Sequence, residues 1–147
     1  MTKYMSGNLV NDIMKSNVIS IDSSMTVKDA AKMMNDAGVG CIVVMEKNST
    51  VGILTERDFV RKIIAQEKSL STPVKDVMSS PLITIDPDES VWELAQLMKV
   101  KRIHKVPVAD KGKLIGIVTS TDLTRLCSIG SDAEMSKICD QILLRMK

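Results

Sequence analysis

A seven-residue pattern that could hold a phosphorylated ligand occurs twice in the chain. It reads Gly-Ile-Leu-Thr-Glu-Arg-Asp at 52–58 and Gly-Ile-Val-Thr-Ser-Thr-Asp at 116–122. Each copy is a predicted strand-to-helix junction, where free backbone N–H groups and the helix dipole favour a phosphate. A threonine hydroxyl can add a hydrogen bond, and an aspartate one turn later can accept hydrogen bonds from ribose hydroxyls. The candidate residues for such a site are Thr55, Arg57, Asp58, Thr119, Thr121 and Asp122.

The same spacing is also an ordinary helix start. In T-x-x-D the threonine caps the helix and the aspartate occupies its first turn, with no ligand required. A single occurrence would favour that interpretation. Capping does not explain, however, why a glycine and two hydrophobic residues precede the threonine in both copies. The two roles are compatible in the same residues, and the sequence leaves both open.

The pattern belongs to a longer internal repeat. Adding 64 to a residue number carries Val-Asn-Asp-Ile-Met at 10–14 onto Val-Lys-Asp-Val-Met at 74–78, and the register continues without a gap to the two junctions. A register held over about fifty positions does not arise by chance, and two copies rather than a long array predict a pseudo-twofold pair of units.

Each copy predicts the element order strand, helix, strand, strand, helix. The expected strands lie over 18–21, 41–45 and 51–54, and in the second copy over 82–85, 106–109 and 114–118. The first helix of each copy has apolar residues at the i, i+3, i+4 and i+7 positions of one face. These residues are Val27, Ala30, Ala31 and Met34, repeated as Val91, Leu94, Ala95 and Met98. The second helices are expected to begin near Glu56 and Ser120.

The first helices also carry start and stop signals. Thr26 and Ser90 stand where a capping box would begin, each with an acidic residue three positions later. Gly38 can end the first helix in a left-handed conformation. The second copy has Arg102 at the matching position, which predicts a different helix end there.

These elements predict an α/β protein made of two tandem units. The first unit is expected over 8–64, a polar linker over 65–72, the second unit over 73–128, and a C-terminal helix over 132–146. One such unit is near the lower size limit for independent stability and would leave one sheet face uncovered. The two units are therefore expected to pack sheet to sheet with pseudo-twofold symmetry.

Charge and composition exclude several classes of partner. The net charge is +2 and aromatic residues make up 2% of the chain, which disfavours binding to nucleic acid. No apolar run approaches the roughly 18 residues needed to span a bilayer, so no membrane association is expected. Three cysteines, far apart and without a C-x-x-C pair, indicate a reducing compartment, and the expected location is the cytoplasm.

Catalysis has little support in the sequence. The chain has one histidine, no clustered metal ligands, and neither a G-x-S-x-G nor a Walker motif. The expectation is that the protein is not an enzyme and uses no metal and no catalytic cofactor.

The V-x-D-[IV]-M opening motif and the G-h-h-T-x-x-D closing motif together resemble a pair of CBS domains, called a Bateman module. The resemblance extends from about Leu9 to Cys127. It implies strand-helix-strand-strand-helix units with adenosine ligands held between their two sheets. The implied ligands are AMP, ADP and ATP, with S-adenosylmethionine and NAD as further candidates.

The resemblance also assigns roles to individual residues. The aspartates of the closing motifs, Asp58 and Asp122, would take the ribose hydroxyls, and Thr55 and Thr119 would help to hold phosphate. The adenine base would lie against the first strand of each copy. The residues concerned are Val18, Ile19 and Ser20 in the first copy and Leu82, Ile83 and Thr84 in the second.

The second copy resembles a phosphate-binding CBS unit more closely. Its Arg-Ile-His-Lys-Val-Pro-Val segment at 102–108 is similar to a basic segment that lies beside the closing motif in nucleotide-binding members. His104 and Lys105 could then face a phosphate, with Pro107 beside them. The first copy offers only Arg57 as a nearby cation. His104 could instead be an exposed residue at a strand edge.

The resemblance therefore implies a regulatory sensor that binds an adenine nucleotide or another adenosyl ligand and signals to an effector protein. Members commonly form homodimers through their second helices, for which Phe59 and Leu123 are the expected contacts. Arg61 and Arg125, matched in the two copies, could serve such a contact or cover apolar surface. The alternative function is a ligand-free protein-interaction or dimerisation module.

Overall fold

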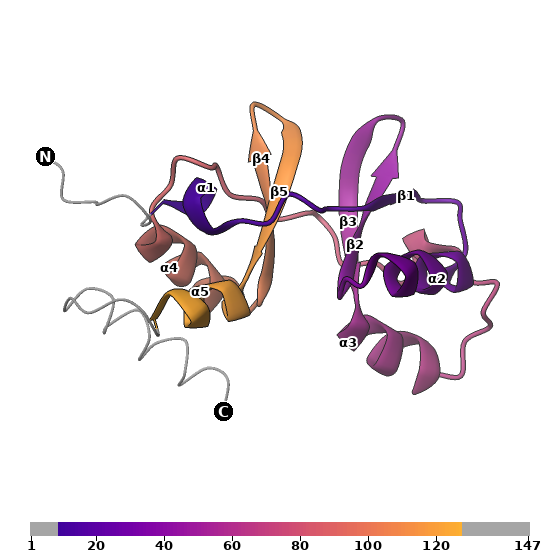
Figure 1. Cartoon of the computed structure of the whole chain (residues 1–147). Helices are drawn as coiled ribbons and strands as arrows, with labels where there is room; N and C mark the ends of the chain where they lie inside the picture. The colour runs from indigo at the N-terminus through magenta and orange to yellow at the C-terminus, as the bar shows by residue number, and fades with distance from the viewer. Residues whose placement is uncertain (1–8, 128–147) are drawn as a thin grey trace, which may run out of the picture. The chain divides into compact units, whose positions relative to one another are not determined.

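In the computed structural model of the protein, the structure is described for residues 9–127. The described chain divides into two compact units, each with helices and a β-hairpin (Figure 1). The first-repeat unit comprises residues 18–83, and the second-repeat unit combines residues 9–17 with 84–127. The expected C-terminal helix over 132–146 lies outside the described residues.

The first-repeat unit contains a three-stranded sheet. Its elements are β1 (Ser20–Asp22), α2 (Val27–Ala37), β2 (Cys41–Glu46), β3 (Ser49–Thr55), α3 (Glu56–Asp58), a π-helix (Phe59–Ile64) and a 3₁₀ turn (Val74–Asp76). The strand order is β1-β2-β3, with β1 parallel and β3 antiparallel to β2. In this arrangement the starts of β1 and β2 and the end of β3 lie at one edge of the sheet.

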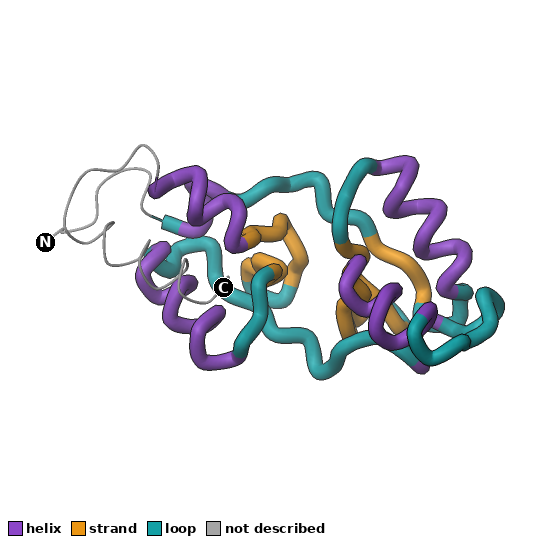
Figure 2. Tube along the Cα trace, turned by 90° about the horizontal axis from the view of Figure 1, so that it is seen from below, coloured by secondary structure: helices purple, strands orange, loops and turns teal. Residues whose placement is uncertain are grey.

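The second-repeat unit has a two-stranded sheet. Its elements are α1 (Val10–Ile13), α4 (Val91–Lys101), β4 (Lys105–Asp110), β5 (Lys113–Thr119) and α5 (Ser120–Cys127). Strands β4 and β5 are antiparallel. Figure 2 shows that the helices of each unit lie on one side of its strands.

The strand predicted over 82–85 does not form. Only Ile85 contributes, through an isolated parallel bridge to Val108. Pro81 and Pro87 flank this stretch, and a proline has no N–H with which to extend a ladder. In the first repeat the corresponding strand does form, as β1.

Both hairpins turn on two residues with positive φ. Lys47 and Asn48 have φ values of 50° and 67°, and Lys111 and Gly112 have 50° and 83°. Positive φ at both central residues is the feature of the type I′ turn, whose twist matches that of the flanking strands. The polar turns expected at these places are therefore present in both repeats.

The helix starts agree with the sequence prediction. The Thr26 hydroxyl accepts a hydrogen bond from the Asp29 N–H, and the Asp29 carboxylate accepts from the Thr26 N–H in return. The Ser90 hydroxyl accepts from the Glu93 N–H at 3.1 Å. Each bond satisfies a backbone donor that the first turn of a helix leaves without an intrahelical partner.

The prediction of a different end for the second helix is wrong. Gly38 ends α2 with φ 66° and ψ 35°, and Arg102 ends α4 in the same left-handed conformation, with φ 58° and ψ 45°. The Arg102 N–H donates to the Met98 carbonyl. The geometry of the helix end is thus retained although the second repeat lacks the glycine that favours it.

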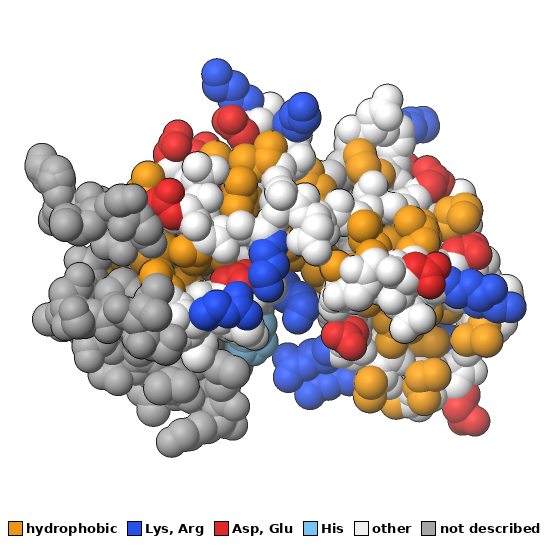
Figure 3. Space-filling model, viewed as in Figure 1, with side chains coloured by type: hydrophobic (Ala, Val, Ile, Leu, Met, Phe, Trp, Pro, Cys, Tyr) orange, Lys and Arg blue, Asp and Glu red, His pale blue; other side chains and the backbone are white. Residues whose placement is uncertain are grey.

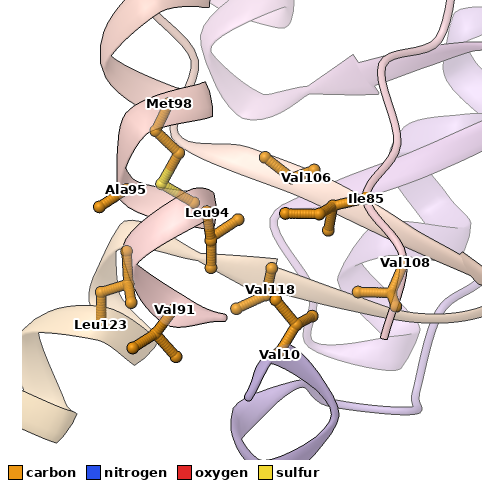
Figure 4. Packing of buried hydrophobic residues seen from close by; sticks show 10 residues of the cluster. All are labelled: Val10, Ile85, Val91, Leu94, Ala95, Met98, Val106, Val108, Val118 and Leu123. Atoms are coloured by element: carbon orange, nitrogen blue, oxygen red, sulfur yellow. The ribbon is translucent and has the colours of Figure 1, made fainter. Parts of the chain in front are cut away.

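Each unit has its own core. In the second-repeat unit Val91, Leu94, Ala95 and Met98 of α4 are all buried, and they meet β4, β5 and Leu123 (Figure 4). In the first-repeat unit Val27, Ala30 and Met34 of α2 are buried as predicted, whereas Ala31 is exposed, so the prediction of a core position is wrong for Ala31. Ala31 is one of the residues that line a surface groove beside α2.

The opening motif of each repeat packs on the closing strand of the other repeat. Lys15, just after the first opening motif, exchanges two backbone hydrogen bonds with Ile117 of β5, at 2.9 and 2.8 Å. Ser79, 64 positions later, exchanges the same pair with Ile53 of β3, at 2.9 and 3.0 Å. Val10 is fully buried in the core of the second-repeat unit. The packing units therefore divide the chain differently from the sequence repeats.

Candidate functional site

The closing motif of each repeat forms a complete capping box at a strand-to-helix junction. In the first repeat the Thr55 N–H donates to Asp58 Oδ2 at 2.9 Å, and the Asp58 N–H donates to Thr55 Oγ1 at 3.3 Å. In the second repeat the same bonds of Thr119 and Asp122 measure 2.9 and 3.2 Å. The threonine hydroxyl also donates to Oδ2 in both copies. Capping is therefore a real role of these residues.

The expectation of free backbone N–H groups at the junction is largely wrong. Besides the two N–H groups of the capping box, the Glu56 N–H donates to the Gly40 carbonyl at 3.1 Å. The Ser120 N–H likewise donates to the His104 carbonyl at 2.9 Å. Because these donors are already bonded, a phosphate at the junction would depend mainly on side chains.

The glycine of the closing motif has a packing role. A Cβ atom at Gly52 would approach Met78 Sδ to 2.6 Å and the Ser79 carbonyl oxygen to 2.8 Å. At Gly116 the corresponding atoms are Met14 Sδ and the Lys15 carbonyl oxygen, both at 2.8 Å. The opening segment, which is the opening motif together with the residue after it (10–15 and 74–79), crosses directly over the glycine. This packing explains why glycine occurs in both copies, without any reference to a ligand.

The aspartates keep one oxygen for partners outside the capping box. Oδ2 is held by the threonine, whereas Oδ1 of Asp58 lies 3.3 Å from Lys62 Nζ. Oδ1 of Asp122 lies 3.3 Å from both Lys15 Nζ and Arg125 Nη1. Both aspartates are buried, since Asp58 is 8% and Asp122 is 4% exposed. Each is therefore a buried carboxylate with a cationic side chain at its Oδ1 atom.

Sequence reasoning missed these cations. Lys62 could have been found, because lysine four residues after aspartate on a helix is an ion-pair spacing. Arg125 donates a hydrogen bond to Asp122, whereas the roles expected for it from the sequence were a dimer contact or the covering of apolar surface. No local signal points to Lys15, which lies in the opening segment of the other repeat.

The first-repeat unit brings most of its predicted site residues to one edge of the sheet. Thr55 pairs with Cys41 at the start of β2, and Ser20 pairs with Val43 further along the same strand. Val18 and Ile19 precede β1 and are half-buried, and the Ile19 carbonyl accepts from the Val43 N–H. Arg57 is exposed. Leu82 and Ile83, predicted for the second site, belong to this unit.

The second-repeat unit brings together the basic segment and the closing motif. Lys105 pairs with Thr119 across β4 and β5, and the preceding residue, His104, accepts from Ser120 through its carbonyl. Lys105 and His104 are both half-buried. Thr84 and Thr121 are exposed. Pro107 is buried within β4, and its carbonyl accepts from the Ile85 N–H at 3.1 Å.

The described part of the chain contains neither a metal-ligand cluster nor a membrane-spanning helix. Among residues 9–127, no group of three or more His, Cys, Asp and Glu side chains is placed to hold a metal ion. None of the helices in this range is long and apolar enough to cross a bilayer.

The repeats match a known protein family. The family model for the CBS domain matches residues 10–65 and again residues 74–128. The chain belongs to the CBS domain family. The tandem CBS pair and its mixed α/β fold, expected from the two motifs, are thereby confirmed.

Relatives of this CBS pair occur among both curated proteins and solved structures. The CBS domain-containing protein YhcV of Bacillus subtilis is 36% identical over 114 residues, which cover 78% of this chain and 81% of that protein. Two other relatives are longer, and the chain spans 61% and 63% of their length.

Two solved structures are similar over most of the chain. The CBS domain pair of protein MJ0100, in complex with 5′-methylthioadenosine and S-adenosyl-L-methionine, is 32% identical with a TM-score of 0.74, and the match covers 82% of this chain and 95% of that chain. The CBS domain protein PAE2072 from Pyrobaculum aerophilum, complexed with AMP, is 24% identical with a TM-score of 0.75, covering 90% and 98%. The second likeness is one of fold.

Proposed function

We propose that this CBS pair is a regulatory module that binds an adenosyl ligand through the aspartates of its closing motifs and catalyses no reaction. The observation that carries the proposal is the set of contacts that the two carboxylate oxygens of Asp122 make. The capping box fixes its carboxylate through Oδ2, while Oδ1 contacts the side chains of Lys15 and Arg125, which are 49% and 62% exposed. A ribose hydroxyl could therefore reach Oδ1 without disturbing the helix cap.

The relatives support an adenosyl ligand. The MJ0100 pair, at 32% identity, binds two such molecules, 5′-methylthioadenosine and S-adenosylmethionine. Within this chain the second-repeat unit has more cations near its aspartate, since Lys105 pairs with Thr119 and His104 precedes it. AMP, ADP and ATP are therefore the preferred candidates for that unit, and the bound state would be read by an effector protein.

Thermal unfolding with added ligands tests this proposal. A ligand that binds only the folded state raises the melting temperature by mass action. We expect a rise with at least one of AMP, ADP, ATP, S-adenosylmethionine and NAD at millimolar concentration, and its loss in Asp122→Ala or in the matched Asp58→Ala. A melting temperature unchanged by all five ligands would instead favour the ligand-free interaction module.

We also propose that the chain forms a homodimer through the surface where α2 and the π-helix meet. A groove of about 510 Å³ lies there, lined by Met34, Gly38, Val39, Phe59 and Val60 among others. Apolar side chains are exposed over this part of the first-repeat unit (Figure 3). Val60 and Ile64 are 63% and 66% exposed, and contiguous exposed apolar surface marks interaction sites.

Leu123 cannot take part in such a contact as expected, because it is fully buried in the core of its own unit. Phe59 remains a candidate contact. Sedimentation velocity at micromolar concentration should show a dimer that Val60→Lys converts to a monomer with unchanged circular dichroism. A wild-type monomer would contradict the dimer proposal without affecting the proposed ligand site.

A further inference from the structure

Each closing-motif aspartate receives one lysine ammonium, but the lysine comes from a different element in each repeat. In the first-repeat unit Lys62 lies on the helix, and its ammonium also contacts Ser79 Oγ at 3.1 Å in the opening segment. The repeat equivalent of Lys62 is Leu126, and the equivalent of Ser79 is Lys15. The lysine therefore lies on the helix in the first-repeat unit and in the opening segment in the second-repeat unit. In both units its ammonium lies beside Oδ1 of the aspartate.

This exchange points to the ammonium as part of the site. A lysine that only covered surface would have no reason to reappear at the same carboxylate oxygen from another segment. The carboxylate is buried in both units, so the ammonium also offsets the cost of burying that charge. The lysine end of each pair is different, because the side chains of Lys15 and Lys62 are 49% and 41% exposed and can be reached by a bound molecule. What the two units share is a buried carboxylate whose Oδ1 atom contacts a lysine ammonium, joined at Asp122 by the Arg125 guanidinium, so a ligand group must compete with these cations for that oxygen.

The backbone of Lys15 is held by hydrogen bonds, whereas its side chain is partly exposed. Its N–H and carbonyl are both bonded to Ile117, two residues before Thr119 on β5. The side chain is about half exposed and extends to Asp122 Oδ1. The ammonium can therefore leave Oδ1 and contact a group bound nearby without any change in the strand.

We propose, on the basis of the ligand site proposed above, that Lys15 makes the second-repeat site selective for adenosyl ligands that carry a phosphate. A ribose hydroxyl that donates to Asp122 Oδ1 competes with the ammonium for that oxygen. A neutral ligand such as adenosine leaves the displaced ammonium without an anion, and cationic S-adenosylmethionine adds a like charge. A phosphate supplies a new anionic partner, and hydrogen bonds between charged groups are the stronger ones.

The test is a set of calorimetric titrations on the full chain carrying Asp58→Asn, which removes the charge from the other aspartate. AMP, adenosine and S-adenosylmethionine are titrated into this protein and into its Lys15→Met and Lys15→Arg derivatives. Lys15→Met should lower the ratio of AMP to adenosine affinity by about tenfold, since one charge-assisted contact is lost. Lys15→Arg should keep the ratio, and Lys113→Met, an exposed lysine at the opposite end of β5 from Thr119, should leave it unchanged.

The outcomes separate the two proposals. Equal changes in AMP and adenosine affinity on Lys15→Met, or no change in either, would overturn the role of Lys15 while leaving the ligand site in place. AMP binding to the wild type but not to Asp58→Asn would place the ligand at the first-repeat aspartate and would also overturn it. Absence of binding of all three ligands to the wild type would overturn the proposed function itself.

Discussion

Met14 lies over Gly116, and a Cβ atom at that glycine would meet its Sδ atom at 2.8 Å. The two residues belong to different motifs of different repeats, and Met78 and Gly52 repeat the relationship in the other unit. The opening and closing motifs therefore contact each other crosswise. Each repeat supplies the segment that completes the other repeat's unit.

Substitution of either glycine by alanine should destabilise the protein. The added methyl would meet a backbone carbonyl at 2.8 Å in both units, Ser79 at Gly52 and Lys15 at Gly116, and a backbone atom cannot move as a flexible side chain can. Overpacking of this kind costs roughly 1–3 kcal/mol. Urea unfolding of Gly52→Ala and Gly116→Ala measures the loss. Stabilities within about 0.5 kcal/mol of wild type, the usual range for neutral surface changes, would show that the segments do not cross as described.

The crosswise packing predicts which unit each opening segment stabilises. Val10 and Val74 are repeat equivalents, and both are fully buried, the first in the second-repeat unit and the second in the first-repeat unit. Val10→Ala and Val74→Ala should each cost roughly 2 kcal/mol.

Hydrogen exchange tells the two variants apart. Val10→Ala should raise amide exchange in β4 and β5, and Val74→Ala in β2 and β3, because local opening follows the unit that has lost its contact. The reverse pattern would mean that each opening segment packs within its own repeat.

The capping boxes predict a matched loss in both repeats. Thr55→Val and Thr119→Val remove the hydroxyl that accepts from the aspartate N–H, at 3.3 and 3.2 Å, and each should cost about 1 kcal/mol. Serine at either position retains the hydroxyl and should restore most of the stability. Chemical denaturation without ligand is the measurement. If valine were tolerated in both repeats, the capping role would be disproved.

The two helix ends offer an exchange experiment. Arg102 adopts φ 58° without the freedom of glycine, and Gly38 adopts φ 66° with no atom within 4 Å of the point where a Cβ would lie. Arg102→Gly should stabilise the protein by roughly 1 kcal/mol, and Gly38→Arg should destabilise it by a similar amount. Thermal melts of both variants and of the double exchange give the comparison. Destabilisation by Arg102→Gly would show that the arginine side chain contributes more than its backbone strain costs.

Local features of this fold were predictable from the sequence. The faces of α4, the caps at Thr26 and Ser90, and both hairpin turns depend on residues close together in the chain, so spacing and residue type indicate them. The strand predicted over 82–85 is wrong for a reason that is also local, since the apolar pattern is present but Pro81 and Pro87 flank it and limit its pairing.

Only the contacts between residues close together in the sequence could be predicted for the candidate site. The pairing of Thr119 with Asp122 spans three residues, and the T-x-x-D spacing shows it directly. The contact between Lys15 and Asp122 joins residues from different repeats. Both opening motifs carry the same apolar pattern, so either would fit either unit, and periodicity alone cannot assign them. The crosswise contact and the lysine that it brings to the aspartate therefore appear only in the folded structure.

The most direct test of the proposed ligand site is the binding affinity of Asp122→Asn compared with wild type, measured by isothermal titration calorimetry with AMP, ATP and S-adenosylmethionine. Asparagine retains one oxygen that can accept from the Thr119 N–H, so the helix cap should survive while the charge and the second carboxylate oxygen are lost. We expect at least one ligand to bind the wild type and to lose about tenfold or more in affinity on substitution. An affinity unchanged in Asp122→Asn and in the matched Asp58→Asn would contradict the account.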